Sequence, residues 1–279
     1  MSLHRFAPAS LLGLGLSLAA AVAFAQAQPQ SEFKPQVGQA GKDVVWVPTS
    51  QALVDKMLDM AKLTPNDFHM DLGSGDGRTV ITAAKRGARS LGIEYNPNMV
   101  ELSQKNAAAA GVSDRAQFRR ADLFETDLSQ ATVITMFLLP SINLKLRPKI
   151  LDLKPGTRIV SNSFTMGEWQ DDETATVDST QGCTTYCTAH LWIVPAKAQG
   201  TWKLPQGELT LKQEFQMLSG TLNTGSRQIA IANGKLRGDQ LSFIAGGVEY
   251  NAKVTGGLME GTAKEGAGTT KFQANRTGT

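Results

Sequence analysis

Apolar runs with two different periodicities alternate along the first two thirds of the chain. Apolar residues from Leu53 to Ala61 recur at helical spacing, which predicts a helix over residues 50–63 with Thr49 or Ser50 as its N-cap. Short apolar runs predict five strands, at residues 67–73, 90–95, 116–124, 131–139 and 157–164. Further helices are expected at residues 78–85, 97–110 and 142–153, the last bent or divided by Pro148. This alternation with short links predicts an α/β fold with a doubly wound, Rossmann-like parallel sheet.

The pattern changes after the fifth predicted strand. Residues 174–178 and 184–194 have the character of strands without a helix between them, which predicts a terminal antiparallel hairpin. From Trp202 onward, short alternating segments are separated by Gly and Asn turns, as in an antiparallel meander forming a small curved sheet or partial barrel. We therefore expect an α/β domain over residues 44–198 and a small antiparallel β domain over residues 199–279. The second domain is expected to serve packing or partner docking and not chemistry.

A glycine-rich turn joins the first predicted strand to the next helix. Residues 71–77 read Asp-Leu-Gly-Ser-Gly-Asp-Gly, and Glu94 ends the following apolar run. A strand, a tight glycine turn and a helix N-terminus bring backbone N–H groups against an adenosine-containing ligand. The dinucleotide fingerprint needs a glycine where this chain has Arg78, and no Gly-Lys-Ser/Thr follows the turn, which argues against NAD and nucleoside triphosphates. The spacing therefore favours S-adenosylmethionine as the cofactor.

Two acids suit that ligand. Asp71 at the strand end can meet the ammonium group of the methionine moiety, and Glu94 can accept hydrogen bonds from the ribose hydroxyls. The alternative is a turn that merely connects a strand to a helix. Three alternating glycines with an acid on either side make that alternative the weaker one.

The N-terminus has the composition of a secretory signal. His4 and Arg5 form a short positive region, residues 11–24 are mostly apolar, and the Ala-x-Ala patterns at residues 23–25 and 25–27 are sites that a signal peptidase accepts. An uncleaved anchor is the alternative, but the apolar run is shorter than the ~20 residues of a spanning helix. We expect a signal peptide over residues 1–27, a linker over 28–43, export to the periplasm or cell envelope, and no stable membrane span after cleavage.

Composition and charge narrow the class of protein further. A chain of 279 residues with 41% hydrophobic residues can form a full α/β domain with a smaller companion. The net charge of +3 is mild, and no run of Lys or Arg is long enough to follow a phosphate backbone. Nucleic acid is therefore not expected as a partner.

Cys183 and Cys187 are the only cysteines of the chain. Two thiols cannot complete a tetrahedral zinc site, and no His cluster lies near in sequence, so no metal is expected. A local disulfide is possible if the residues between them form a turn, whereas a regular strand would hold the two residues too far apart. The histidines His69 and His190 fall in predicted strands, where a structural role is more common than a role as a base.

The order of these motifs resembles the class I S-adenosylmethionine-dependent methyltransferases, over roughly residues 47–195. It is most similar to a small family of bacterial proteins and mitochondrial protein-lysine methyltransferases. Four segments carry the resemblance: Val-Pro-Thr at 47–49, the turn at 71–77, Phe-Leu-Leu-Pro at 137–140 and Gly-Glu-Trp at 167–169. The resemblance implies methyl transfer to a protein side chain, with lysine as the expected acceptor.

The resemblance also implies roles for individual residues. Those expected to bind the cofactor are Asp71, Gly73, Ser74, Gly75, Gly77, Glu94, Asp122 and Leu123, with the last two at the adenine edge. Asp122 has an alternative role as a turn cap. Candidates for the substrate side are Pro48, Thr49, Pro140, Ser141, Asn143, Glu168 and Trp169. No catalytic residue is assigned, because methyl transfer depends chiefly on alignment.

Three points bear on the acceptor. Glu168 could assist deprotonation of a lysine amine, or it could belong to a solvated acidic loop. The fourth predicted strand lacks the Asn/Asp-Pro-Pro-Tyr/Phe arrangement of many DNA-adenine and glutamine methyltransferases, which argues against those substrates. The alternatives to a protein-lysine methyltransferase are a small-molecule methyltransferase and a noncatalytic exported binding protein that retains the fold.

Overall fold

A computed structural model describes residues 1–3 and 33–278 of the chain. Contacts divide the chain into two units, Met1–Phe33 and Lys34–Thr279, and the fold described below belongs to the second. The expected signal peptide lies almost wholly outside the described residues. Within the described part, no helix is long and apolar enough to cross a membrane.

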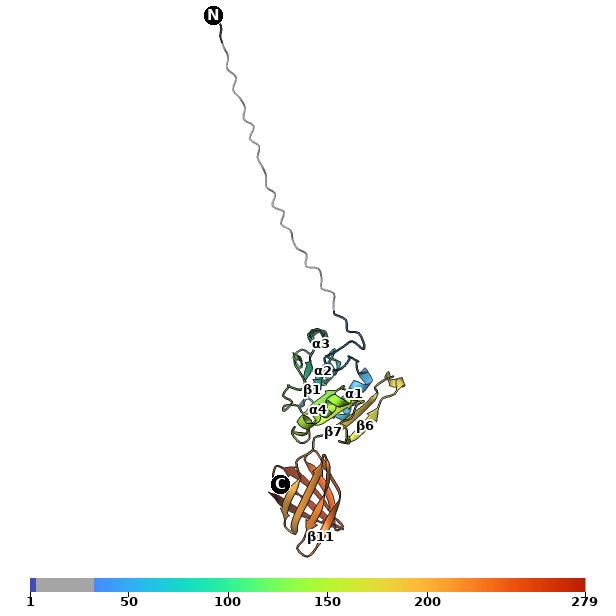
Figure 1. Cartoon of the computed structure of the whole chain (residues 1–279), viewed down its shortest axis with the longest axis vertical. Coiled ribbons are helices and arrows are strands. Elements are labelled where there is room, and N and C mark those ends of the chain that lie inside the picture. Colours follow the sequence, from blue (N-terminus) through green and yellow to red (C-terminus); the bar gives the residue numbers. More distant parts are fainter. Residues whose placement is uncertain (4–32, 279) are drawn as a thin grey trace. The chain divides into compact units, whose positions relative to one another are not determined.

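The first domain is built on a seven-stranded sheet in the order β3-β2-β1-β4-β5-β7-β6. Figure 1 labels β1, β6 and β7 of this sheet and the four helices of the domain. Its strands are β1 (Phe68–Leu72), β2 (Arg89–Glu94), β3 (Ala116–Arg120), β4 (Val133–Met136), β5 (Arg158–Asn162), β6 (Glu173–Thr176) and β7 (Thr188–Ile193). Its helices are α1 (Gln51–Met60), α2 (Arg78–Lys85), α3 (Pro97–Ala109) and α4 (Pro140–Leu151), with a short 3-10 helix η1 (Ser179–Gln181) before β7. The Rossmann-like α/β architecture expected from the sequence is confirmed.

Strand pairing creates a crevice at the centre of this sheet. Strands β1 to β5 pair in parallel, and the chain order reverses between β1 and β4, which are neighbours. All four residues of β4 are buried, as the continuous apolar run predicts. At such a reversal the loops after the two strands diverge and leave room for a ligand at their carboxyl ends. Strands β6 and β7 add the antiparallel hairpin predicted from the sequence.

Several element boundaries differ from the prediction. Strand β3 ends at Arg120, so Asp122 lies in the loop that follows and not in the strand. Helix α4 begins at Pro140, because a proline at the first helical position needs no hydrogen-bond partner for its nitrogen. Pro148 lies inside this single helix and does not divide it. Ser50 caps α1 by accepting a hydrogen bond from the Leu53 N–H.

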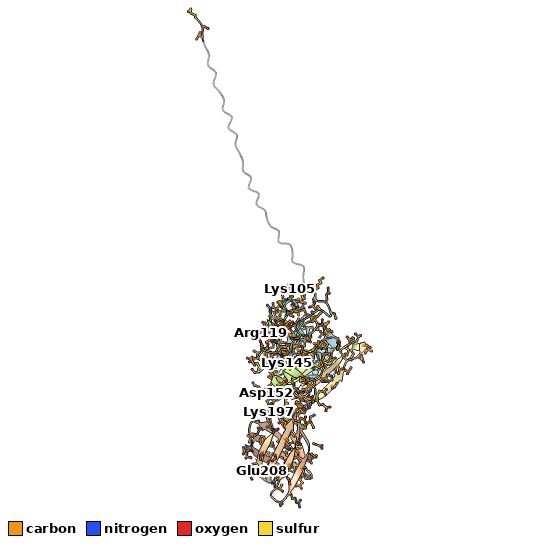
Figure 2. All side chains as sticks on the ribbon, viewed as in Figure 1. Lys105, Arg119, Lys145, Asp152, Lys197 and Glu208 are labelled. Carbon is orange, nitrogen blue, oxygen red and sulfur yellow. A yellow bond between two sulfur atoms is a disulfide. The ribbon has the colours of Figure 1, made fainter. Side chains whose placement is uncertain are left out.

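The second domain is a closed eight-stranded antiparallel barrel. Its strands are β8 (Gly200–Leu204), β9 (Gly207–Glu214), β10 (Met217–Asn223), β11 (Gln228–Arg237), β12 (Gln240–Ala245), β13 (Val248–Thr255), β14 (Leu258–Glu265) and β15 (Gly268–Gly278). The sequence predicted a curved sheet or partial barrel; pairing of β15 with β8 closes it. Large side chains such as Trp202 and Phe243 fill the interior, whereas charged ones such as Glu208 lie outside (Figure 2).

Candidate functional site

The glycine turn after β1 depends on backbone angles that favour glycine. Gly73, Gly75 and Gly77 have φ of 78°, 54° and 83°. A Cβ on Gly77 would also lie 2.7 Å from the Phe118 ring, so this glycine lets α2 pack against β3. The turn therefore reverses the chain tightly at the crevice and leads directly into α2.

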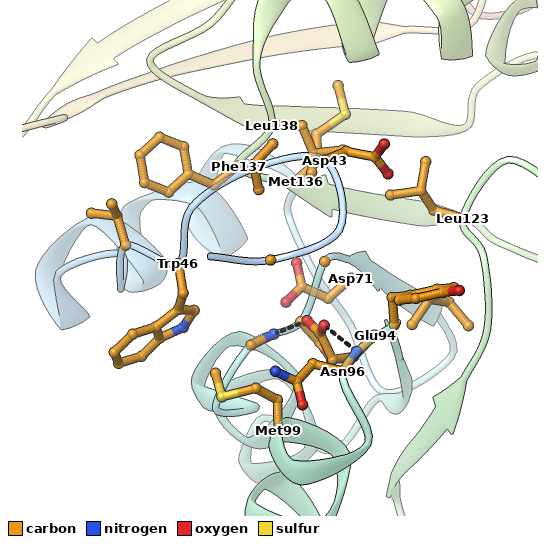
Figure 3. A pocket seen from close by; sticks show the side chains of 18 of the residues that line it. Asp43, Trp46, Asp71, Glu94, Asn96, Met99, Leu123, Met136, Phe137 and Leu138 are labelled. Carbon is orange, nitrogen blue, oxygen red and sulfur yellow. Dashed lines mark hydrogen bonds between the residues drawn. The ribbon is translucent and has the colours of Figure 1, made fainter. Parts of the chain in front are cut away.

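Glu94 at the end of β2 holds the turn from the other side. One carboxylate oxygen accepts a hydrogen bond of 3.0 Å from the Gly75 N–H, and the other accepts one of 2.9 Å from the Asn96 N–H (Figure 3). The carboxylate thus joins the glycine turn to the start of α3. A ligand hydroxyl would meet an acceptor already fixed in position.

Asp71 is the buried acid of the site. It lies opposite Thr135 on β4, whose hydroxyl donates a hydrogen bond of 2.6 Å to it. Burial raises the pKa of Asp71 to about 7, and the charges of Glu94 and Asp76 act in the same direction, whereas the hydrogen bond from Thr135 opposes them. A cationic ligand at this position would favour the ionised carboxylate.

Asp122 has two structural partners. One of its oxygens accepts a hydrogen bond of 2.8 Å from the Phe124 N–H, which is the turn-cap role recognised as an alternative. The other forms an ion pair of 2.5 Å with Lys42. The hydrogen bond from Lys42 is the main reason that the pKa of Asp122 lies below its ordinary value.

These residues surround a cavity of about 500 Å³, a size typical of small-molecule sites. The predicted residues that line it are Asp71, Gly73, Ser74, Gly75, Glu94, Asp122, Leu123, Pro48 and Thr49. The predicted residues outside its lining are Gly77, Pro140, Ser141, Asn143, Glu168 and Trp169. The structure thus gathers most of the expected cofactor residues and only two of the expected substrate-side residues.

The residues outside the lining have other partners. Asn143 is fully buried and donates hydrogen bonds of 3.2 Å to the carbonyl groups of residues 164 and 165. Glu168 forms an ion pair of 2.8 Å with Arg147, and Trp169 is fully buried. Asn143 thus ties α4 to the loop after β5, and Glu168 is paired on the surface.

One side of the cavity is formed by a segment that the sequence indicated only at its end. Residues 39–49, here called the strap, all line it. Figure 3 shows the strap carrying Asp43 and Trp46 at the pocket. Trp46 lies so close to the glycine turn that a Cβ on Gly75 would be 2.6 Å from its indole nitrogen. The available signal was Trp46, a large aromatic residue just after the expected linker, since such a residue is costly to leave exposed.

The charge of the lining suits a cation. The lining contains five acidic and two basic side chains, and each basic side chain forms an ion pair with a different one of these acids. The acids are Asp43, Asp71, Asp76, Glu94 and Asp122, and the basic residues are Lys42 and Arg78. S-Adenosylmethionine carries a positively charged sulfonium and ammonium group, so this excess of carboxylates fits it. No group of three or more His, Cys, Asp or Glu within the described ranges could hold a metal ion.

Part of the chain is similar in sequence to known methyltransferases. The family profile of the ANTKMT methyltransferase domain matches residues 71–173. A protein-lysine N-methyltransferase of Saccharolobus islandicus is 42% identical over 138 residues, which are 48% of this chain and 86% of that protein. The adenine nucleotide translocase lysine N-methyltransferase of mouse is 36% identical over 46% of this chain, and the match spans only 56% of the mouse protein.

A solved structure extends the comparison to a bound ligand. It is described as an RNA methyltransferase from Salinibacter ruber in complex with S-adenosyl-L-homocysteine. It is 47% identical to this chain, with a TM-score of 0.50, and covers 54% of this chain and 95% of its own. S-Adenosylhomocysteine is the demethylated product of S-adenosylmethionine.

Proposed function

Because the chain belongs to the family of S-adenosylmethionine-dependent methyltransferases that includes protein-lysine N-methyltransferases, we propose that it methylates lysine side chains of a protein. The enzyme class and the cofactor follow from the family. The acceptor is the proposal, and it is supported by the charge of the cavity.

S-Adenosylmethionine supplies a methyl group already activated by a sulfonium, so the protein's task is to hold and align the reactants. In this proposal Asp71 meets the ligand's ammonium group, and Glu94 accepts hydrogen bonds from the ribose hydroxyls. Asp122 and Leu123 would border the adenine. The acceptor amine must arrive neutral, because its nitrogen lone pair forms the new bond to carbon.

The excess of acids in the lining is the observation that favours lysine. Five carboxylates against two paired cations attract an ammonium group and repel the phosphates of a nucleic acid. RNA is the other macromolecular acceptor to test, because the Salinibacter ruber structure is described as an RNA methyltransferase. A phosphate-binding site would instead need unpaired Lys or Arg side chains near the cavity.

The acceptor class can be tested with defined polymers. The purified full chain, with S-adenosylmethionine labelled in its methyl group, is offered poly-L-lysine, poly-L-arginine as a charge-matched control, and total RNA. We expect label in poly-L-lysine alone, as Nε-methyl-lysine by mass spectrometry, and none with Glu94→Ala. Label only in RNA, or in none of the three polymers, would contradict the lysine proposal.

We also propose that the protein acts outside the cytoplasm, in the periplasm or cell envelope. Cys183 and Cys187 form a disulfide, a bond that persists in oxidising compartments. Cell fractionation followed by N-terminal sequencing tests this. We expect protein in the periplasmic or envelope fraction that begins after Ala25 or Ala27, whereas uncleaved protein in the cytoplasm would contradict the proposal.

A further inference from the structure

Three aromatic rings meet at the cavity, and each comes from a different loop. Phe137 follows β4, Phe164 follows β5, and Tyr186 precedes β7. The ring centroids of Phe137 and Phe164 are 6.0 Å apart, and that of Tyr186 lies 5.2 Å from the first and 6.0 Å from the second. All three residues line the cavity. We call them the aromatic trio.

The trio differs from an ordinary packed aromatic cluster. In the barrel, Phe243 and Tyr250 stack at 4.5 Å and are only 2% and 4% exposed, because they fill a core. Tyr186, by contrast, is 47% exposed although it contacts two other rings. Its ring therefore contributes surface to the cavity as well as to packing.

The disulfide fixes the loop that carries Tyr186. The bond between Cys183 and Cys187 closes a loop of five residues, within which Tyr186 has a φ of 56°. Cys183 is buried and belongs to the hydrophobic cluster that includes Leu53 and Met57 of α1. The loop is thus anchored to the core on one side, while the tyrosine ring is held toward the cavity on the other.

We propose that the aromatic trio is the binding site for the acceptor lysine and that the disulfide keeps Tyr186 in this site. The inference rests on the proposed function and deepens it. Aromatic faces attract ammonium groups and bind N-methylated ammonium groups in the same way. The apolar rings also cover the aliphatic stem of lysine. The acids of the same cavity draw the cation toward the site.

Tyr186 variants test the site. Tyr186→Leu keeps an apolar side chain and removes the aromatic face, whereas Tyr186→Phe keeps the face. With a ten-residue lysine peptide, we expect Tyr186→Leu to raise KM roughly tenfold, with kcat and the Kd for S-adenosylhomocysteine little changed. Tyr186→Phe should stay close to wild type, as should Thr184→Ala, an exposed change in the same loop. An unchanged KM in Tyr186→Leu would mean that the tyrosine only packs.

The disulfide is tested by its removal. The double variant Cys183→Ser, Cys187→Ser and the reduced wild-type enzyme should both show the increase in KM of Tyr186→Leu, with the Kd for S-adenosylhomocysteine unchanged. Far-UV circular dichroism and thermal unfolding show whether the domain stays folded. If both forms are folded and keep the wild-type KM, the role of the disulfide is wrong.

A binding measurement keeps this test separate from the proposed function. Calorimetry compares a peptide containing trimethyl-lysine with the same peptide containing norleucine, an uncharged side chain, in the presence of S-adenosylhomocysteine. We expect wild type to bind the trimethyl-lysine peptide roughly tenfold more tightly than the norleucine peptide. Tyr186→Leu should bind the two peptides equally weakly. Absence of lysine methylation with this preference intact would overturn the activity and support the site. Equal binding of the two peptides to wild type would overturn the site, whatever the activity.

Discussion

Thr135 donates a hydrogen bond of 2.6 Å to Asp71 and thereby links β4 to the buried acid that lines the cavity. The same hydroxyl lies 2.8 Å from Nε2 of His69. Because the threonine proton is used toward Asp71, Nε2 of His69 carries the proton that bonds to Thr135, and Nδ1 accepts from Ser90 at 2.5 Å. Burial lowers the pKa of His69 to about 3, so the imidazole is neutral in this chain of hydrogen bonds.

The first prediction concerns the pH dependence of cofactor affinity. Burial raises the pKa of Asp71 to about 7, so the free protein holds it mostly protonated below that pH. In the proposed binding mode the ligand's ammonium group pairs with the ionised form of Asp71, so affinity for S-adenosylmethionine should rise roughly fivefold from about pH 6 to about pH 7. Calorimetric titration across this range measures it.

Two variants at this pair of residues serve as controls. Asp71→Asn should bind weakly and without this rise in affinity. Thr135→Val removes a hydrogen bond that lowers the pKa of Asp71, so the rise should move to higher pH. A rise that persists in Asp71→Asn would assign the titration to another group.

The second prediction concerns stability without cofactor. Burial raises the pKa of Asp71 from 3.8 to about 7 in the folded protein. At a pH between these two values, the folded state therefore holds a proton that the unfolded state has lost. Its contribution to stability therefore falls as pH rises from about 4 to about 7 and stays lost above that. At about 1.4 kcal/mol per pKa unit, the cost at pH ~8 is on the order of 4 kcal/mol. Asp71→Asn should then be more stable than wild type at pH ~8 in urea unfolding, and equal stability would contradict this.

The sequence predicted the central elements of the fold because local signals specify them. The helix expected at residues 78–85 is α2 with the same bounds, since glycines precede it and its apolar face is regular. The turn at residues 71–77 and the acid at Glu94 could be assigned from spacing alone. In these places one short segment determines both the structure and the candidate chemistry.

The remainder depends on contacts between distant segments. The barrel closes through pairing of β8 with β15, and no local sequence pattern predicts this pairing. The strap has no periodicity, and its place at the cavity comes from contacts such as that of Trp46 with the glycine turn. The aromatic trio joins three loops whose residues are up to 49 positions apart, from Phe137 to Tyr186. The proximity of such distant residues cannot be predicted from a single sequence.

The third prediction concerns the strap. Lys42 pairs with Asp122 across the cavity's edge, and both residues line the cavity. Lys42→Met removes this ion pair between the strap and Asp122, so we expect the variant to release S-adenosylhomocysteine faster than wild type. The increase should be only about twofold to fivefold and confined to low salt, because an exposed ion pair contributes little and is screened by salt. Stopped-flow fluorescence of Trp46, which lines the cavity, can follow release.

The ion pair of Lys253 with Asp239 in the barrel provides a matched control, because it is 3.3 Å long and far along the chain from the strap. Lys253→Met should leave the release rate unchanged. The difference between Lys42→Met and wild type should also disappear at ~1 M salt. If it persists there, lost packing and not lost charge would be the cause.

The fourth prediction concerns the contact between the barrel and the α/β domain. Phe215, in the turn between β9 and β10, stacks on Trp169 with ring centroids 6.0 Å apart and planes 12° apart. The guanidinium of Arg147 lies 5.3 Å from the Phe215 ring. Phe215→Ala removes both contacts and should cost roughly 1–3 kcal/mol in urea unfolding, since the side chain is half-buried.

The separation of the two domains can be followed in the same experiment. In Phe215→Ala, tryptophan fluorescence and far-UV circular dichroism should give different midpoints, because the domains no longer unfold as one unit. Met217→Ala, an exposed apolar change two residues away, should alter stability by less than about 0.5 kcal/mol. If Phe215→Ala keeps wild-type stability and coincident midpoints, the stacking of Phe215 on Trp169 does not couple the barrel to the methyltransferase domain.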